Sequence, residues 1–381
     1  MGECPKRGMR GASPCADQIE FTLFGPGYGE CAVVHLGANR WMVVDSCLDT
    51  TTGKPAVLEY FDVIGVSAKE AVRLIVVSHW HDDHVRGLGE VVLSCPNASV
   101  CCSSALTKEE FLAHVLDYEN IMTQITSAGV REIAEVLRVL KDRSHRPKIA
   151  LVNRQILSLP ADGAADPCTV TTLSPSDVEY ALFLSDIATM LPQARQTKLR
   201  SPSSRPNDVA VALWVEMGPV KLLLGSDLED SRGDTAGGWS AIIQSTERPK
   251  GRASIFKVPH HGSVTGHHDR VWSEMVAQSP IAVLSPFHLA DITLPSHCDV
   301  ARIVKLAPES YITTRDHAPR SKKQRISAVE RTIRETVGKI RLAQPRMGWV
   351  RLRNGGKSDP NNWNVELSHE ACRLDALAGG I

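Results

Sequence analysis

The sequence lacks several features that mark common classes of protein. No apolar run approaches the roughly 20 residues that span a bilayer, and the N-terminal segment has no apolar stretch like that of a secretory signal. The 43 basic and 43 acidic residues cancel, so net charge points to neither nucleic acid nor an anionic membrane. The ten cysteines include no C-x-x-C pair, which argues against a structural zinc knuckle. We therefore expect a cytoplasmic protein with reduced thiols and no membrane partner.

Short apolar segments alternate with helical patterns along most of the 381 residues. The predicted strands cover residues 19–24, 31–36, 41–45, 73–78, 149–159, 168–173, 208–216, 220–225, 255–258, 281–285 and 310–314. Helices are predicted near residues 55–64, 176–191, 269–277 and 298–307. Interleaved strands and helices predict a layered α/β domain. Residues 1–17 are expected to form a flexible tail, and residues 105–145 a helical insertion.

One short segment concentrates residues that bind metal ions. His79, His81, Asp83 and His84 follow directly after a predicted buried strand. Because alternate residues of an extended chain face the same side, His79 and His81 can reach one metal ion together. Asp83 and His84 lie one bend further along and can reach a second. Imidazole and carboxylate groups suit zinc, manganese or iron.

Further candidates stand at the ends of other apolar strands, where α/β proteins place their chemistry. Asp227 ends Leu-Leu-Leu-Gly-Ser-Asp, where a carboxylate is placed to bridge two metal ions, and Asp45 ends Met-Val-Val-Asp. Alone, either aspartate is more simply a turn residue or a helix cap. His260 and His261 follow Ile-Phe-Lys-Val-Pro. We favour His260 as the ligand because it comes first, with His261 in a supporting or substrate-contacting role.

The order of these motifs resembles the metallo-β-lactamase superfamily, and more narrowly the hydrolase domain of the ComEC-type competence proteins. Besides the histidine segment, the resemblance is carried by Gly25-Pro-Gly-Tyr-Gly-Glu-Cys, Lys221-Leu-Leu-Leu-Gly-Ser-Asp227 and Lys257-Val-Pro-His-His-Gly-Ser263. It covers a hydrolase domain of residues 18–317, with Gly348-Trp-Val-Arg-Leu as a candidate last strand. Residues 318–381 are then expected to be a basic C-terminal extension.

This resemblance implies a four-layer αβ/βα sandwich with two divalent metal ions, zinc or manganese, at the sheet edges. It implies six metal ligands, namely His79, His81, Asp83, His84, Asp227 and His260. It also implies that Asp45 orients the histidine segment, and we take Asp83, Asp45 and His261 as the catalytic candidates. One feature departs from many superfamily members, which supply a further histidine to the first metal ion. Here only His114 and His145 fall in that interval, both inside the helical insertion, so Asn207 or Asp208 becomes a candidate replacement.

Basic residues near the C-terminus bear on the nature of the substrate. Residues 302–353 hold fourteen lysines and arginines against four acidic residues, which makes a candidate phosphate-binding face. An amphipathic helix with solvated charges explains the same pattern equally well. With the ComEC-type resemblance, the first hypothesis is a nuclease or phosphodiesterase that cleaves DNA through a metal-bound hydroxide, with nucleic acid as its partner. The alternatives are a hydrolase of small esters, lactones, thioesters or cyclic nucleotides, and a hydrolase subunit of a larger complex such as a phage-defence system.

Overall fold

Two eight-stranded sheets form the centre of the computed structural model, which describes residues 11–103, 128–190, 206–230, 237–289, 292–315 and 347–378. The first sheet has the order β17 (Trp363–Leu367), β16 (Trp349–Asn354), β1 (Glu20–Phe24), β2 (Cys31–His35), β3 (Trp41–Val44), β4 (Val72–Val77), β5 (Ser99–Ser103) and β6 (Lys148–Ala150). The second has the order β18 (Cys372–Arg373), β15 (Ser310–Ile312), β12 (Val276–Leu284), β11 (Ala253–Lys257), β10 (Val220–Leu224), β9 (Leu213–Met217), β8 (Cys168–Thr172) and β7 (Arg154–Leu159). A separate hairpin joins β13 (Phe287–Leu289) to β14 (Ile292–Leu294).

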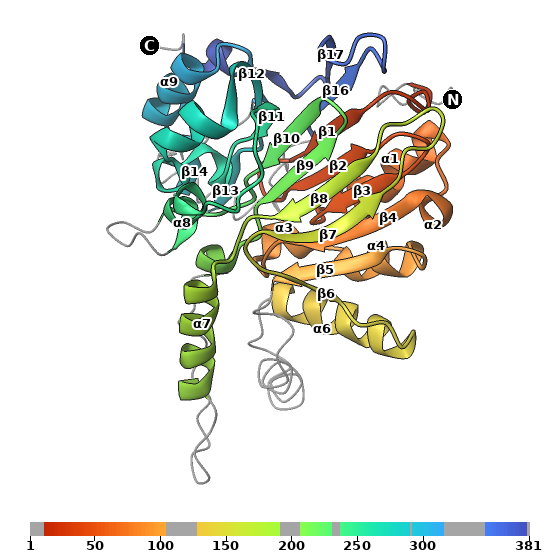
Figure 1. The fold of residues 1–381 in the computed structure, drawn as a ribbon, viewed down its shortest axis with the longest axis vertical. Helices are drawn as coiled ribbons and strands as arrows, with labels where there is room; N and C mark the ends of the chain where they lie inside the picture. Colours follow the sequence, from red (N-terminus) through yellow and green to blue (C-terminus); the bar gives the residue numbers. More distant parts are fainter. Residues whose placement is uncertain are drawn as a thin grey trace, which may run out of the picture.

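Helices cover the outer face of each sheet, so the molecule has four layers (Figure 1). On the side of the first sheet lie α1 (Ala56–Ile64), α2 (Ala68–Ala71), α4 (Leu88–Ser94) and α6 (Ala128–Asp142). On the side of the second sheet lie α8 (Gly238–Gln244) and α9 (His297–Leu306). The helix α7 (Asp177–Met190) projects away from both sheets (Figure 1). This is the four-layer αβ/βα sandwich that the family resemblance implied, and it confirms the layered α/β domain predicted from the pattern of strands and helices.

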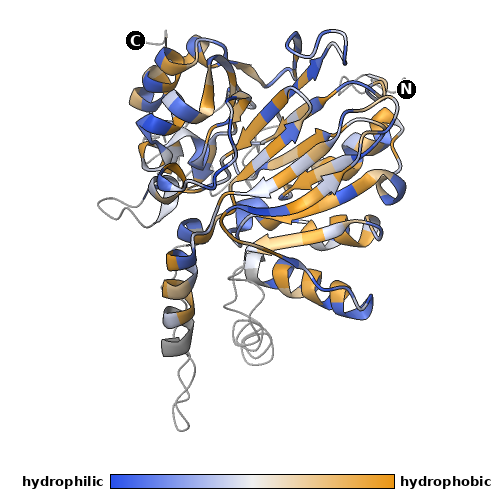
Figure 2. Ribbon diagram, viewed as in Figure 1, coloured by the Kyte–Doolittle hydropathy of each residue, from blue (hydrophilic) through white to orange (hydrophobic). Residues whose placement is uncertain are grey.

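Three apolar clusters hold the layers together, and the alternation of side chains along the strands produces them. In β1, Phe21 and Leu23 point between the sheets while Phe24 points towards the helices. The same alternation separates Met42 from Val43 in β3. Because both faces of these strands are buried, their sequences are mainly apolar, as the hydropathy colouring of the sheets shows (Figure 2), with Glu20 and Thr22 of β1 as buried polar exceptions.

The chain order brings the carboxyl ends of four parallel strands to one edge of the sandwich. β3 runs parallel to β4 in the first sheet, and β10 runs parallel to β11 in the second. The residues that follow these strands are predicted site residues, with Asp45 after β3 as an orienting residue and metal ligands after the other three. The fold therefore gathers loops from both halves of the chain at a single place.

Two predicted segments differ from the structure. Residues 149–159 form two strands in different sheets, β6 and β7, because the chain turns at Asn153, whose backbone has a φ of 55°. Residues 208–216 begin as the 3-10 turn Pro206–Val209, and only Leu213–Met217 is strand.

The described residues 347–378 pair with strands of both large sheets, so this part of the chain belongs to the hydrolase domain, contrary to the predicted boundary at residue 317. β16 pairs along its length with β1 and so lies inside the first sheet. β18 pairs with β15 at the edge of the second. The prediction of a last strand at residues 348–352 is confirmed by β16. The physical reason is that β1 and β15 need partners for their backbone groups, which the last described residues supply.

The second half of the predicted helical insertion is α6, which packs on α3 (Asp82–Val85) and α4 rather than standing apart. Its apolar side chains, including Ile133 and Val136, join the cluster outside the first sheet. Residues 104–127 of the insertion and the predicted tail, apart from residues 11–17, lie outside the described residues. Within the described ranges, no helix combines the length and apolar character required to cross a bilayer.

Candidate metal centre

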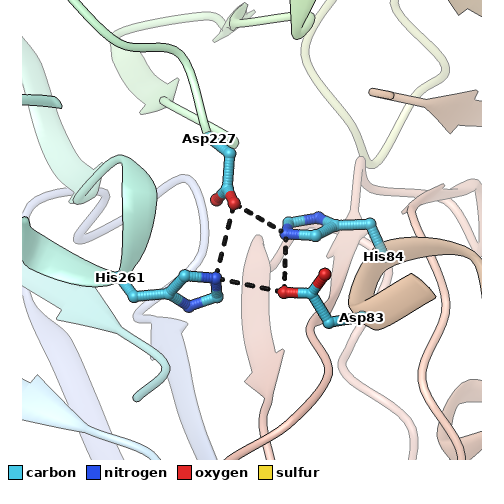
Figure 3. A group of neighbouring side chains, drawn as sticks. All are labelled: Asp83, His84, Asp227 and His261. Carbon is cyan, nitrogen blue, oxygen red and sulfur yellow. Dashed lines mark ion pairs between the residues drawn. The ribbon is translucent and has the colours of Figure 1, made fainter. Parts of the chain in front are cut away.

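Six predicted site residues meet at the shared edge of the two sheets. His79 and His81 follow β4, and Asp83 and His84 stand in the single turn of α3. The other two come from the second sheet, Asp227 after β10 and His261 after β11. Figure 3 shows Asp83, His84, Asp227 and His261 pointing towards one another. We call these four the four-residue group.

The spacing of the four-residue group matches the ligand shell of one metal ion. His84 Nε2 is 3.3 Å from Asp227 Oδ2 and 3.7 Å from Asp83 Oδ2. His261 Nε2 is 3.3 Å from Asp83 Oδ2 and 3.4 Å from Asp227 Oδ2. Ligand atoms held about 2.0–2.1 Å from a tetrahedral zinc ion lie roughly 3.3–3.4 Å apart. His84 Nε2 and His261 Nε2 are buried without a hydrogen-bond partner, so both nitrogens fit a metal ion.

The ring orientation of each buried histidine is fixed through its other nitrogen. His84 Nδ1 is 2.8 Å from Asp45 Oδ2, and His79 Nδ1 is 2.9 Å from Ser78 Oγ. His261 Nδ1 is 3.2 Å from both the carbonyl and the hydroxyl of Ser285. In the neutral form of the ring, which is the form that binds metal, a proton on Nδ1 satisfies each of these oxygens and leaves the Nε2 lone pair towards the centre.

Asp45 supports the site from behind, as the resemblance implied. Its Oδ1 accepts a hydrogen bond from the Ser78 backbone N–H at 2.7 Å, and its Oδ2 accepts one from the Ser78 hydroxyl at 2.6 Å. The same Oδ2 contacts His84. Asp45 therefore holds both the start of the histidine segment and one of its rings, without facing the centre itself.

The charges of the four-residue group balance one another. Burial alone would lower the pKa of His84, but Asp227 and Asp83 outweigh it and hold that pKa well above its ordinary value. Burial also opposes the charged form of His261, and Asp227, Asp83 and Glu30 outweigh it, raising the pKa of His261 to about 9. Conversely, burial would raise the pKa of Asp227, but His84 and His261 keep it well below its usual range. The buried carboxylates thus require positive charge, which a divalent cation can provide.

A second set, the three-residue group, consists of His79, His81 and Asp227. His79 Nε2 lies 3.1 Å from His81 Nδ1 and 3.9 Å from Asp227 Oδ2. Burial and the neighbouring charge of His84 hold the pKa of His79 well below its ordinary value. Burial likewise lowers the pKa of His81. Both imidazoles are therefore neutral, the form that binds metal, and Asp227 is common to the two groups.

His261 occupies the place in the four-residue group that the sequence analysis gave to His260. His260 and His261 have φ values of 47° and 51°, so the chain turns sharply after Pro259 and the second ring reaches the centre. His260 Nδ1 instead lies 2.7 Å from Thr265 Oγ1 and 3.2 Å from Glu229 Oε1. Its ring lines the cavity beside the centre. Sequence order alone could not show this turn, because a left-handed backbone is uncommon outside glycine.

Among the described residues, no further histidine joins His79 and His81 in the three-residue group. His145 is exposed after α6, and His114 lies outside the described residues. Asn207, one of the two predicted replacements, lines the cavity and has its Oδ1 buried without a hydrogen-bond partner. Its Nδ2 donates to Glu229 Oε1 at 2.8 Å. Asp208 stands beside it in the 3-10 turn Pro206–Val209.

A buried ion pair behind the centre joins the two halves of the molecule. Lys257, at the end of β11, is 2% exposed, and its ammonium pairs with Glu30 from the loop before β2. It also donates to the Ser226 carbonyl at 2.9 Å and lies 4.0 Å from Asp227 Oδ1. Glu30 in turn accepts from the Ser285 hydroxyl that contacts His261. These positioning residues were not predicted, although a lysine inside the apolar strand Ile255–Val258 was a signal.

The helix α6 supports the histidine segment from outside. The backbone N–H of Gly129 donates to Asp82, and a side chain at Gly129 would collide with the Trp80 carbonyl. The Glu132 carboxylate accepts from the backbone N–H groups of Gly87 and Gly89, at 3.1 and 3.2 Å. The insertion thus braces the loop that carries the candidate ligands.

A cavity of about 510 Å³ opens beside the two groups. Its polar lining comprises His81, Asp82, Asp83, Asn207, Asp227, His260 and His261. Its apolar lining comprises Tyr28, Trp80, Phe287, Leu289, Ile292 and Leu294. Its volume is in the range of pockets that hold a small molecule.

Comparison with known proteins agrees with this architecture. The model of the metallo-beta-lactamase superfamily matches residues 24–148, about a third of the 381-residue chain. The match includes the histidine segment and the strands of the first sheet up to β6. Residues 24–148 are therefore similar in sequence to this superfamily, and the two sheets with helices on their outer faces form an αβ/βα sandwich. The narrower ComEC-type resemblance stays a prediction.

Several solved structures are similar to this chain at low sequence identity. The metallo-beta-lactamase fold protein YhfI from Bacillus subtilis is 10% identical, with a TM-score of 0.37, and the match covers 78% of this chain and 95% of that one. A HARLDQ-motif mutant of the metallo-beta-lactamase from Cronobacter sakazakii is 14% identical, with a TM-score of 0.36, over 65% of this chain and 79% of that one. Zinc-bound PqqB from Methylobacterium extorquens is 12% identical, with a TM-score of 0.27, over 60% and 75%.

Proposed function

We propose that this protein is a hydrolase that uses two divalent metal ions, zinc or manganese, and that its substrate is a small molecule. The observation that carries the proposal is the four-residue group, whose two inward-facing imidazole nitrogens and two carboxylates have the spacing of a metal shell beside the cavity. In this proposal, Asp83, His84, Asp227 and His261 hold one ion. His79, His81 and Asp227 hold the other.

The chain contributes orientation and charge to this chemistry. When bound, the ions supply Lewis acidity to the scissile group and lower the pKa of a water molecule. Asp45 and Ser78 fix the histidine rings, so that the ligand nitrogens are aligned before any metal arrives. The Lys257 ammonium offsets the negative charge of Glu30 and Asp227 behind the centre.

The lining of the cavity favours a small substrate over a polyanion. Within the described part of the chain, no lysine or arginine lines the cavity, whereas the carboxylates Asp82, Asp83 and Asp227 do. Arg86 is the nearby cation, and its guanidinium lies 4.7 Å from the centre of the Tyr28 ring. An extended phosphodiester chain gains most of its affinity from several cationic contacts. An ester, lactone, thioester or cyclic nucleotide has no such need.

A nuclease that acts on DNA is the second candidate, and the basic stretch of residues 302–353 favours it. Nine of its fourteen lysines and arginines fall in residues 316–346, outside the described ranges. Of the others, Arg351 pairs with Glu366 and Arg353 with Glu20. Arg302 pairs with Asp299. Because these three arginines form ion pairs within the protein, they contribute to the fold. The nuclease proposal therefore rests on the other basic residues of 302–353.

One panel of assays separates the candidates. The purified protein, with its metal content measured by elemental analysis, is incubated with p-nitrophenyl butyrate, a γ-lactone, a thioester, cyclic AMP, and linear DNA and RNA. We expect turnover of one of the small substrates and about two metal ions per chain. Cleavage of DNA with no turnover of the small compounds would favour the nuclease.

The variants Asp83→Asn and His81→Ala show whether the observed activity belongs to this centre. Both should lower it by at least about 100-fold, because each removes a proposed ligand. The control is Asp269→Asn, since the Asp269 side chain is 94% exposed and contacts His267 outside both groups. Activity that survives in both ligand variants would show that the centre is not catalytic.

A further inference from the structure

The β13–β14 hairpin forms one side of the cavity with apolar side chains only. Phe287, Leu289, Ile292 and Leu294 all line it, and we call these four the hairpin wall. Their strands pair in a two-stranded unit that belongs to neither large sheet. Tyr28 and Trp80 extend the apolar lining on the neighbouring sides.

Two side chains of the hairpin wall expose much of their apolar surface to solvent. Leu289 is 51% exposed and Ile292 is 57% exposed. Burying such side chains is worth about 25 cal/mol for each Å² of apolar surface removed from water, and exposed apolar clusters commonly mark binding sites. Single exposed residues such as Leu93, on α4 and also 51% exposed, need no such explanation.

The wall is fixed next to the proposed metal ligands. The Phe287 ring centre lies 5.2 Å from that of His261 and 5.6 Å from that of Tyr28. The backbone N–H of His288 donates to the Gly27 carbonyl at 2.6 Å, which ties the hairpin to the loop before β2. The Phe287 end of the wall therefore adjoins His261, one of the proposed metal ligands.

The chemistry of the wall selects one kind of occupant. Three of its four side chains are branched aliphatic groups, which pack against a flexible hydrocarbon chain without a preferred ring plane. Among the described residues that line the cavity, no lysine or arginine offers a partner for a second anionic group. A ligand with its polar end at the metal centre and a hydrocarbon chain along the wall matches both features.

We propose that the hairpin wall is the subsite for the acyl chain of a carboxylic ester or lactone substrate, and that it sets the preferred chain length. This inference rests on the proposed hydrolase function. In the reaction, the oxygen of water bonds to the acyl carbon, the bond from that carbon to the leaving oxygen breaks, and a proton passes to the leaving oxygen.

Binding of product-like carboxylates tests the subsite without any turnover. Dissociation constants of butyrate and octanoate for the zinc-loaded protein are measured by titration calorimetry. We expect octanoate to bind at least about tenfold more tightly, since each fully buried methylene strengthens binding by about fourfold. The double variant Leu289→Ser/Ile292→Ser should reduce this preference to less than about threefold. Leu289→Met/Ile292→Val should keep it.

The matched control is Leu93→Ser, which removes an equally exposed leucine from another face. It should leave the preference unchanged, and all variants should retain the metal content and thermal midpoint of the parent. The ratio of kcat/KM between p-nitrophenyl octanoate and butyrate should follow the binding preference in every variant.

The two proposals fail in different ways. If octanoate preference depends on Leu289 and Ile292 but no ester or lactone is hydrolysed, the subsite stands and ester hydrolysis is wrong. If esters are hydrolysed through Asp83 but the hairpin double variant keeps the parent's chain-length preference, the subsite is overturned and the hydrolase stands. Equal affinity for butyrate and octanoate in the parent overturns the subsite as well.

Discussion

The two groups of candidate ligands share Asp227 but differ in how firmly their residues are held. All members of the four-residue group are buried, whereas in the three-residue group His81 is only partly buried. In the four-residue group, His84 and His261 are each fixed through Nδ1 by a protein oxygen. In the three-residue group, His79 has such a contact with Ser78, while His81 Nδ1 faces His79.

The two groups also differ in charge, and this difference predicts different affinities for metal ions. The four-residue group contains two carboxylates and holds protons on its histidines when no metal is bound. The three-residue group has neutral histidines and only the shared carboxylate. More ligands, more negative charge and firmer orientation strengthen metal binding. We therefore expect the four-residue group to hold its ion tightly and the three-residue group to hold its ion more weakly.

The largest effect is expected from Asp227→Asn, because this change removes the one residue that both groups share. Metal content should fall from about two ions to less than one, with a loss of activity of at least about 100-fold. Elemental analysis after dialysis measures the metal content, and an assay with the best substrate measures the activity. Asp230→Asn is the control, since Asp230 hydrogen-bonds Ser240 instead. Two ions retained by Asp227→Asn would contradict the shared role.

A smaller effect, confined to one group, is expected from His261→Ala. This variant should lose the tightly held ion, whereas His260→Ala should keep both ions, because His260 contacts Thr265 and Glu229. Stepwise removal with a chelator, followed by elemental analysis, distinguishes the two variants. The reverse result would restore His260 as the ligand and refute the geometry of the turn after Pro259.

Asp45→Asn should have a moderate effect that separates orientation from coordination. The amide keeps the size of the side chain but cannot accept from Ser78 and His84 in the same way, so the affinity of the four-residue group should fall by about 10–100-fold. The three-residue group should lose less affinity, because Asp45 reaches His79 only through Ser78. Competition with a fluorescent chelator measures both values. Equal weakening of both ions would indicate a general loss of folding.

The smallest effect is a difference in pH dependence. The raised pKa values of His84 and His261 mean that both hold protons at pH 7 in the metal-free chain, and a metal ion must displace them. Affinity of the four-residue group should therefore rise with pH up to about 9, the pKa of His261. The lowered pKa values of His79 and His81 predict no comparable rise for the other group above pH 6.5. Calorimetry in buffers of different ionisation enthalpy counts the protons released by each ion.

The sequence predicted the layered α/β class and most of the site, because both follow from local patterns. Asp227 ends an apolar strand, and the histidine segment follows one, so the rule about strand ends was enough to find them. The choice between His260 and His261 depended on a left-handed turn that no local pattern specifies. The pairing of β16 with β1 joins segments more than 300 residues apart, and such long-range pairing has no signal in either segment alone. Lys257 and Glu30 likewise meet only because the two sheets face each other.

The pairing of β16 with β1 and of β18 with β15 also has a consequence for the order of events during translation. Every candidate ligand, from His79 to His261, is synthesised before residues 349–354, which complete the first sheet beside β1. Until they emerge from the ribosome, β1 has one free edge, and Gly25 lacks the backbone carbonyl of Gly348 that accepts its N–H. The candidate ligands are thus present on a nascent chain whose first sheet is still incomplete. That sheet can be completed only after every candidate ligand has been synthesised.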